Sequence, residues 1–155
     1  MKKQFSLQSA VAAGIIATAA MTVFAYMAPL MGFEMNIPNM LANTMGAPII
    51  VGWLAHFMIG VILAINFVAV FLNATGKSSD IKNGAFFGLI PWIIAQVIVM
   101  PMMSIMNGGS YIDGFFSGSI MIAMASLVGH LIYGGVLGGL YKILSQKVIV
   151  TTEGN

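Results

Sequence analysis

The sequence predicts an all-α membrane protein, a four-transmembrane-helix bundle that forms one membrane domain over residues 1–155. Its composition is the first observation, since 59% of the residues are hydrophobic, only 6% are charged and the mean hydropathy is +0.99. Such values are typical of integral membrane proteins. The second observation is that four apolar segments are each long enough to cross about 30 Å of hydrocarbon as a helix. They lie at about 7–31, 48–72, 84–105 and 117–144.

The lysines predict the orientation of the chain. All six fall on one predicted face: before the first span, between the second and third, and at the end of the fourth. Glu34 and Asp113 lie in the opposite connections. Because lysine-rich connections stay in the cytoplasm, we expect both termini on the cytoplasmic side of a bacterial inner membrane. The lysine side is called the inner end below. The net charge of +2 reflects this distribution, and no nucleic-acid partner is expected.

The chain contains two similar helical hairpins. HFMIGVILA begins at His56, and HLIYGGVLG begins 74 residues later at His130. A weaker similarity, at an offset of 72, relates residues 27–31 to residues 99–103. These spacings predict one helical stripe that is used twice by a duplicated hairpin. In a bundle with antiparallel neighbours, the second and fourth spans are diagonal partners, so the two histidines are expected to face each other in the outer half.

These histidines are the only two in the chain, and they predict a cofactor site. An ionisable side chain within a span usually faces the bundle interior, a partner or a cavity. A neutral imidazole is a good ligand for haem iron. Gly60 and Gly134, one turn from His56 and His130, would leave room for a flat macrocycle. The residues therefore predict a haem b held by both histidines, in an electron-transfer or accessory subunit of a respiratory membrane complex.

A second interpretation needs no cofactor. Small residues at every fourth position also let helices approach closely. A histidine in such an interface can hydrogen-bond to a carbonyl, to Thr18 or Thr22 of the first span, or to Gln96 of the third. The chain would then be a structural accessory subunit of a larger membrane complex, or a homo-oligomer that associates through the glycine rows of its fourth span.

The methionines suggest a third interpretation. Of the fourteen in the chain, twelve map to the outer half or the outer connections. Thioethers are soft ligands that suit Cu(I), so an outer-facing Cu(I) binding or delivery protein is an alternative. Methionine is also an adaptable packing residue, which is the simpler explanation of its abundance. The candidate Cu(I) ligands are Met100, Met102, Met103 and Met106.

Catalytic chemistry is not expected. Within the spans, Asp, Glu, Lys and Arg occur only at the ends, whereas pumps and ion-coupled transporters usually carry such residues within the membrane. The sequence has no serine-hydrolase, zinc-protease or phosphate-loop motif. The chain has no cysteine, which excludes disulfides and thiolate sites. We therefore expect a non-catalytic protein.

Three stretches resemble a known protein family. They are GWLAHFMIG from Gly52, VMPM from Val99 and LVGHLIYGGVLG from Leu127. They are similar to a family of small bacterial four-span membrane proteins that is catalogued as a domain of unknown function, with GW..HF..G and HLIYG..LG as its specific motifs. The likeness covers nearly the whole chain. It implies the four-span architecture and a bacterial origin, and it implies no catalytic residues.

Overall fold

The computed structural model describes residues 5–32 and 34–153, with side chains described as far as Gln146 except that of Met31. This part of the chain is helical throughout, with no strand, and confirms the predicted fold class. The ends of every predicted span lie within three residues of the ends of the corresponding observed span. The four helices long and apolar enough to cross a membrane cover Leu7–Leu30, Ile49–Thr75, Ile81–Met106 and Ile120–Gln146.

Two of the spans are interrupted by π-helical segments. The first span is α1 (Leu7–Tyr26), and the fourth is α8 (Ile120–Glu153). The second consists of α3 (Ile49–Asn66), a π-helical segment (Phe67–Phe71) and α4 (Leu72–Thr75). The third consists of α5 (Ile81–Ile94), a π-helical segment (Ala95–Val99) and α6 (Met100–Met106). The outer connections contain 3₁₀ turns (Ala28–Met31 and Phe115–Gly118), α2 (Ile37–Thr44) and α7 (Tyr111–Gly114).

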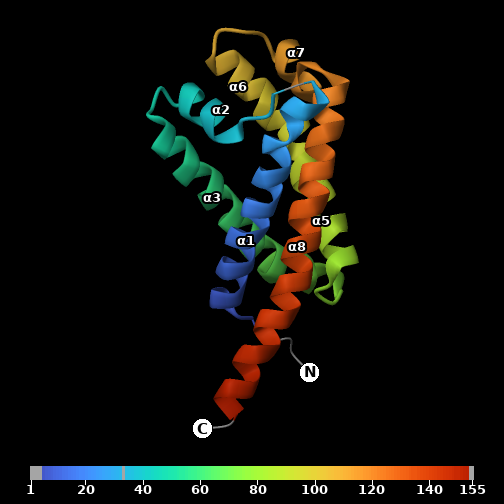
Figure 1. Cartoon of the computed structure of the whole chain (residues 1–155). Coiled ribbons are helices and arrows are strands. Elements are labelled where there is room, and N and C mark those ends of the chain that lie inside the picture. Colours follow the sequence, from blue (N-terminus) through green and yellow to red (C-terminus); the bar gives the residue numbers. More distant parts are fainter. Residues whose placement is uncertain (1–4, 33, 154–155) are drawn as a thin grey trace.

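The spans pack as a ring in which the second and fourth are diagonal. α1 packs against α3 and α8, and α5 packs against α8 (Figure 1). A hydrogen bond of 2.5 Å joins α3 to α8 across the interior, because the Tyr133 hydroxyl donates to the Gly60 carbonyl. The predicted diagonal relation is therefore confirmed. It places the stripes that carry the histidines on opposite walls of one interior.

The inner half of the bundle is filled by aromatic and aliphatic side chains. Phe67 is fully buried and its ring lies 5.1 Å from that of Phe87, which ties the second span to the third. Leu137 and Tyr133 of α8 belong to the same apolar cluster. This cluster closes the inner half, so the polar residues of the interior are concentrated in the outer half.

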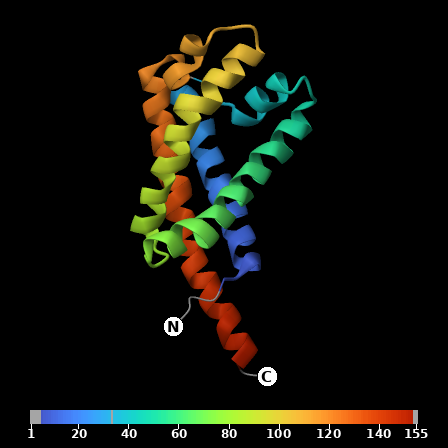
Figure 2. The same cartoon turned by 180° about the vertical axis from the view of Figure 1, so that it is seen from behind.

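The outer half is wider because α3 leans away from the other spans, as Figures 1 and 2 show. The short helix α2 fills the angle. Its contact with α3 is at Gly52, where an added Cβ would lie 2.0 Å from the Pro38 carbonyl oxygen. A glycine is needed at this point because the backbone of α2 lies directly against α3.

The two hairpins repeat the same helix contacts. Close approaches between α1 and α3 recur between α5 and α8 at positions related by offsets of 70 in the first helix and 74 in the second. This agreement supports the duplication inferred from the sequence. The matching pairs are Gly14–Gly60 with Gly84–Gly134, Gly14–Ala64 with Gly84–Gly138, and Thr18–Gly60 with Gly88–Gly134.

The offset between the first and third spans differs between the inner and the outer half, and the π-helical segment Ala95–Val99 accounts for part of this difference. The similarity of residues 27–31 to 99–103 has an offset of 72, whereas the contacts in the inner half have an offset of 70. A π-bulge inserts an extra residue into a helix, so the register shifts beyond it. Directly after it, Pro101 has no N–H to donate to the Val97 carbonyl, and the Tyr111 hydroxyl donates to that carbonyl instead.

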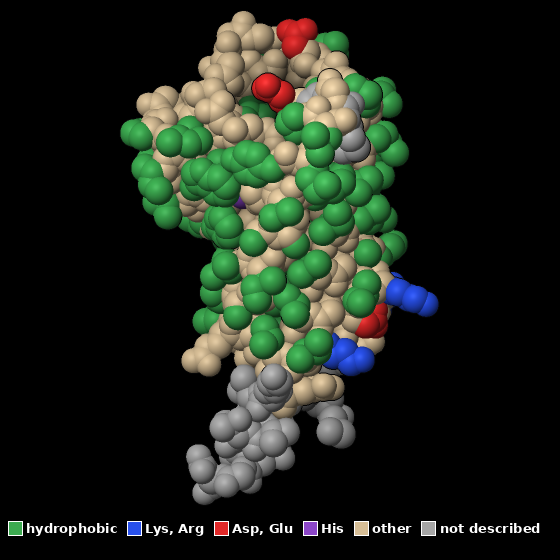
Figure 3. Space-filling view, in the orientation of Figure 1, with side chains coloured by type: hydrophobic (Ala, Val, Ile, Leu, Met, Phe, Trp, Pro, Cys, Tyr) green, Lys and Arg blue, Asp and Glu red, His purple; other side chains and the backbone are tan. Residues whose placement is uncertain are grey.

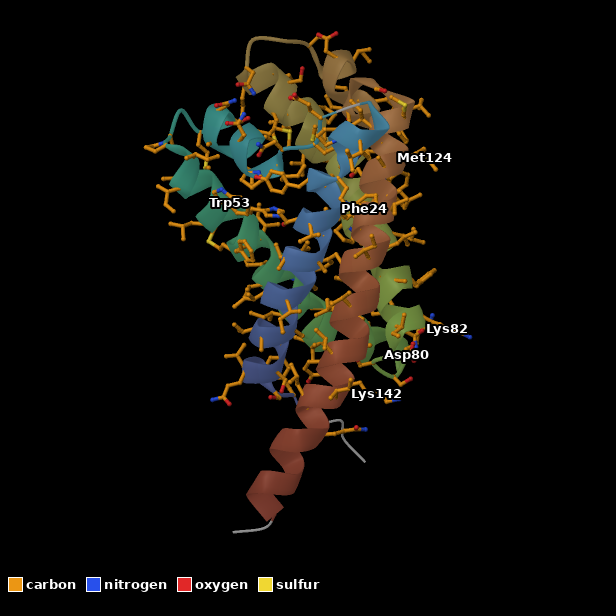
Figure 4. All side chains as sticks on the ribbon, in the orientation of Figure 1. Phe24, Trp53, Asp80, Lys82, Met124 and Lys142 are labelled. Carbon is orange, nitrogen blue, oxygen red and sulfur yellow. The ribbon has the colours of Figure 1, made fainter. Side chains whose placement is uncertain are left out.

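Charged side chains separate between the two ends of the bundle. Lys82 and Lys142 lie at one end (Figure 4), and Figure 3 shows acidic side chains at the other. Asp80 also lies at the lysine end (Figure 4). Lys2 and Lys3, which contributed to the predicted orientation, lie outside the described residues. The charge separation follows the predicted pattern, while the direction across the membrane stays a prediction.

Candidate functional site

The two histidines lie on opposite walls of the outer half of the bundle. His56 is on α3 and is 7% exposed, and His130 is on α8 and is half-buried. They are near enough to interact electrostatically, and no hydrogen bond joins them within the described residues. The structure thus brings together the two residues that the repeat singled out.

His56 is held by a threonine of the first span. Its Nε2 lies 2.9 Å from the Thr22 hydroxyl oxygen. That hydroxyl donates its only hydrogen to the Thr18 carbonyl, at 2.7 Å, because a carbonyl can only accept. The Thr22 oxygen must therefore accept from Nε2–H of His56. It follows that the lone pair of a neutral His56 is on Nδ1.

His130 is held by its own helix. Its Nδ1 lies 2.8 Å from the Ser126 carbonyl, which is one turn earlier on α8. Since the carbonyl accepts, Nδ1 carries the hydrogen and Nε2 carries the lone pair. Neither Nε2 of His130 nor Nδ1 of His56 has a hydrogen-bond partner among the described residues. Each imidazole is thus oriented by one hydrogen bond that it donates, and its other nitrogen can accept a proton or bind a ligand.

A small cavity adjoins His56 between α1 and α2. Its volume is about 10 Å³, which is enough for about one water molecule. Tyr26, on its wall, stacks on Trp53 with ring centroids 6.1 Å apart. In Figure 3 histidine colour is visible at one point between α1 and α3. The cavity is lined by Met21, Thr22, Ala25, Tyr26, Met35, Ile37, Pro38 and His56.

Neighbouring helices fill the space beside the glycines that lie one turn from the histidines. A Cβ added to Gly60 would lie 1.8 Å from the Thr18 hydroxyl oxygen, and one added to Gly134 would lie 2.1 Å from the Gly84 carbonyl oxygen. They therefore allow close helix packing and leave no room for a macrocycle. His56 also presents Nδ1, next to the ring carbon that bears its Cβ, where a flat macrocycle would collide with the side chain. The described arrangement does not fit a haem.

A chain of polar side chains approaches His130 from the outer end. The Ser117 hydroxyl donates to Oε1 of Gln96 at 2.7 Å, and Nε2 of Gln96 donates to the Ser126 hydroxyl at 3.3 Å. Gln96 is 1% exposed and lies in the π-helical segment of the third span. The sequence predicted Gln96 as a possible histidine partner, placed Ser126 only in the repeated stripe of small residues, and gave no role to Ser117. In the repeat, Ser126 aligns with Gly52 of the first hairpin. A polar residue at the place of a glycine was the sequence signal that could have indicated its role.

The methionines predicted as Cu(I) ligands do not share one face of α6. Met103 is buried, Met100 is half-buried, and Met102 and Met106 are exposed. Three or more thioethers would have to point to one place to enclose a Cu(I) ion. Within the described residues, no group of three His, Cys, Asp or Glu residues is placed to hold a metal ion either.

The glycine rows of the fourth span are used inside the bundle. Gly134 and Gly138 lie against the backbone of α5, and Gly135 and Gly139 lie beside the Ile81 side chain. Gly134, Gly135 and Gly138 are buried and Gly139 is partly exposed, so the rows form no continuous exposed surface for association with a second copy. The prediction of a homo-oligomer that uses these rows loses its physical basis, although association through other surfaces stays a prediction.

Comparison with known proteins assigns the chain to a family. The model of a family of unknown function, DUF6789, matches residues 5–151. The chain belongs to the DUF6789 family. This match covers nearly the whole chain, as the resemblance noted from the sequence did. No curated protein and no solved structure matches the chain.

Proposed function

We propose that this DUF6789 protein is a small non-catalytic accessory subunit of a larger assembly in a bacterial inner membrane, and that it carries no haem. The observation that carries the proposal is the packing at Gly60 and Gly134. Thr18 and the backbone of α5 occupy the spaces that a macrocycle would need. The histidines then act as polar packing residues that fix the rotation of α3 and α8.

The shape of the molecule supports action through its surfaces. Among the described residues, the inner half is filled by the aromatic cluster around Phe67 and Phe87. α8 continues past the inner ends of the other helices (Figures 1 and 2). A helix that leaves its bundle is stabilised mainly by packing against a neighbour, which a partner subunit would supply.

The experiment is native electrophoresis of the tagged protein, expressed at its natural level and extracted with a mild detergent. A discrete complex well above the 16.4 kDa of the chain is expected, with the same partner subunits in independent preparations. Substitution of Asn39, an exposed residue of α2, serves as a neutral control for the tag and handling. Migration as a monomer under every mild condition would overturn the proposal.

A second candidate is Cu(I) binding, and the cavity beside His56 favours it. Met21 and Met35 line the same cavity as His56, whose Nδ1 is free. One imidazole and two thioethers form a ligand set that suits Cu(I), and the cavity is sized for one ion. Titration with Cu(I) under reducing conditions tests this function. One ion per chain should be lost in Met21→Leu/Met35→Leu and retained in Met102→Leu/Met106→Leu; the reverse pattern would place copper on α6.

A further inference from the structure

The inner end of the bundle has an open groove where α5 begins and α8 leaves the bundle. Its volume is about 610 Å³, far larger than the cavity beside His56. Lys82 and Lys142 line it, and Figure 4 shows both at this end, beside Asp80. Lys82 lies at the start of the third span and Lys142 near the end of the fourth, which are the two helices of the second hairpin. The groove is therefore a basic site at the level where lipid headgroups lie.

The nearby carboxylate of Asp80 offsets only part of the positive charge of the groove. Asp80 accepts hydrogen bonds from the Asn83 amide nitrogens, both at 2.8 Å, and from the Ser78 hydroxyl at 2.9 Å. These neutral donors hold the pKa of Asp80 below its usual range, so its charge is fixed at the start of α5. No ion pair joins Asp80 to Lys82 or Lys142 within the described residues. Both ammonium groups are thus available to an anion.

One wall of the groove is apolar. Ile81 is 67% exposed and Ile143 is 52% exposed, and both line the groove. Gly139 of α8 lies beside the Ile81 side chain and adds no side chain of its own to the groove. Asn83 and Gln146 add hydrogen-bonding groups at the polar end. The groove therefore pairs a cationic, hydrogen-bonding end with an apolar side, which is the polarity of a phospholipid.

We propose that this groove binds an anionic phospholipid, with the phosphate between Lys82 and Lys142 and an acyl chain against Ile81 and Ile143. Juxtamembrane lysines attract anionic lipids on the cytoplasmic side of a membrane. The apolar wall favours a lipid over a free phosphate ion, which would use only the charged end. The site is separate from the histidines, so the inference does not depend on the proposed accessory function.

The test is native mass spectrometry of the full chain with phosphatidylglycerol, and with phosphatidylcholine as the zwitterionic comparison. Retention of one phosphatidylglycerol molecule is expected, with weaker retention of phosphatidylcholine. Lys82→Gln/Lys142→Gln should weaken phosphatidylglycerol binding roughly 30-fold, from the contribution of each lysine near an anionic surface. Lys77→Gln, at a lysine outside the groove, should leave binding unchanged, and Lys82→Arg/Lys142→Arg should retain it.

A second variant tests the sign of the electrostatics. Asp80→Asn keeps the helix cap, because asparagine caps as well as aspartate, but removes one negative charge from the rim. It should bind phosphatidylglycerol more tightly than the wild type. Equal binding by the wild type and Lys82→Gln/Lys142→Gln would overturn the proposal. Stabilisation by inorganic phosphate that is as strong as by the lipid would overturn the lipid assignment and leave an anion site.

Discussion

Each histidine is oriented by one hydrogen bond that it donates. Nε2–H of His56 donates to Thr22, and Nδ1–H of His130 donates to the Ser126 carbonyl. Thr22 in turn donates to the Thr18 carbonyl, so the pair forms a directional chain from His56 into α1. In the hydrocarbon region of a membrane, no water is present to form hydrogen bonds with an unpaired polar group. These bonds therefore fix the rotation of the two helices that carry the histidines.

Replacing Thr22 with valine tests this role. The variant keeps the volume of the side chain but leaves Nε2–H of His56 without an acceptor. Hydrogen bonds within membranes average about 0.6 kcal/mol, so with the added cost of an unpaired donor we expect the free energy of unfolding to fall by about 1 kcal/mol or more. Thr22→Ser retains the hydroxyl and is the matched control. Equal stability of the two variants would show that the bond is dispensable.

Sequence reasoning predicted the histidines but could not choose their partners. Thr18, Thr22 and Gln96 were all within reach on helical spacing. In the structure Thr22 binds His56, while Gln96 bonds to Ser117 and Ser126. The choice depends on helix rotation, and the π-helical segment that carries Gln96 changes that rotation by inserting a residue. Nothing in the local residue pattern indicates such an insertion.

At the scale of the elements, close helix approach at glycine builds both hairpins. α5 and α8 meet backbone to backbone at Gly84, Gly134 and Gly138. The sequence showed two interleaved glycine rows on α8, but the spacing of the rows is the same, so it could not say which row faces α5. Their neighbours in space distinguish them: Gly134 has no room for a Cβ, whereas Gly135 has ordinary contacts at 3.5 Å.

This difference predicts opposite responses in adjacent residues. Gly134→Ala forces a Cβ against the Gly84 carbonyl oxygen and should lower the free energy of unfolding by about 1–3 kcal/mol, as overpacked substitutions do. Gly135→Ala fits and should be neutral or stabilising, because alanine favours a helix over glycine. Unfolding by denaturing detergent measures both variants. Similar destabilisation by the two substitutions would contradict the assignment of the rows.

The start of α5 predicts a dependence on pH. The hydrogen bond from the backbone N–H of Asn83, and then that from Ser78, lowers the pKa of Asp80 in the folded state. A lowered pKa adds stability above the pKa of the unfolded chain, and this stability is lost as the pH falls through the folded value. Lowering the pH should therefore reduce the stability of the wild type more than that of Asp80→Asn. Thermal unfolding of both proteins over a series of pH values measures this difference. Parallel curves for the two proteins would contradict this role.

At the scale of the whole molecule, the four spans were predictable because hydrophobic length dominates the folding of a membrane chain. All four were found within three residues of their predicted bounds. The leaning of α3 and the wedge formed by α2 were not predictable, because they depend on the close contact of Gly52 with Pro38 across an outer connection. The widened outer half is therefore a tertiary effect, and it determines the cavity beside His56.

The orientation across the membrane can be tested because the chain has no cysteine. Single cysteines can be placed at Ser78, in the inner connection, and at Asn39, in an outer one; both positions are exposed. If lysines determine the topology, an impermeant thiol reagent added to intact cells should label Asn39→Cys only. Ser78→Cys should react after the membrane is broken. Labelling of Ser78→Cys in intact cells would reverse the orientation.

We propose that the close packing at Gly60 and Gly134, beside His56 and His130, leaves no space for a haem. The most direct measurement is the reduced-minus-oxidised absorption spectrum of the purified protein after expression in haem-replete cells. We expect no Soret band and no difference spectrum from the wild type, because neighbouring helices fill the space beside Gly60 and Gly134. His56→Ala and His130→Ala should give the same result. A low-spin haem spectrum in the wild type that either substitution removes would contradict the account.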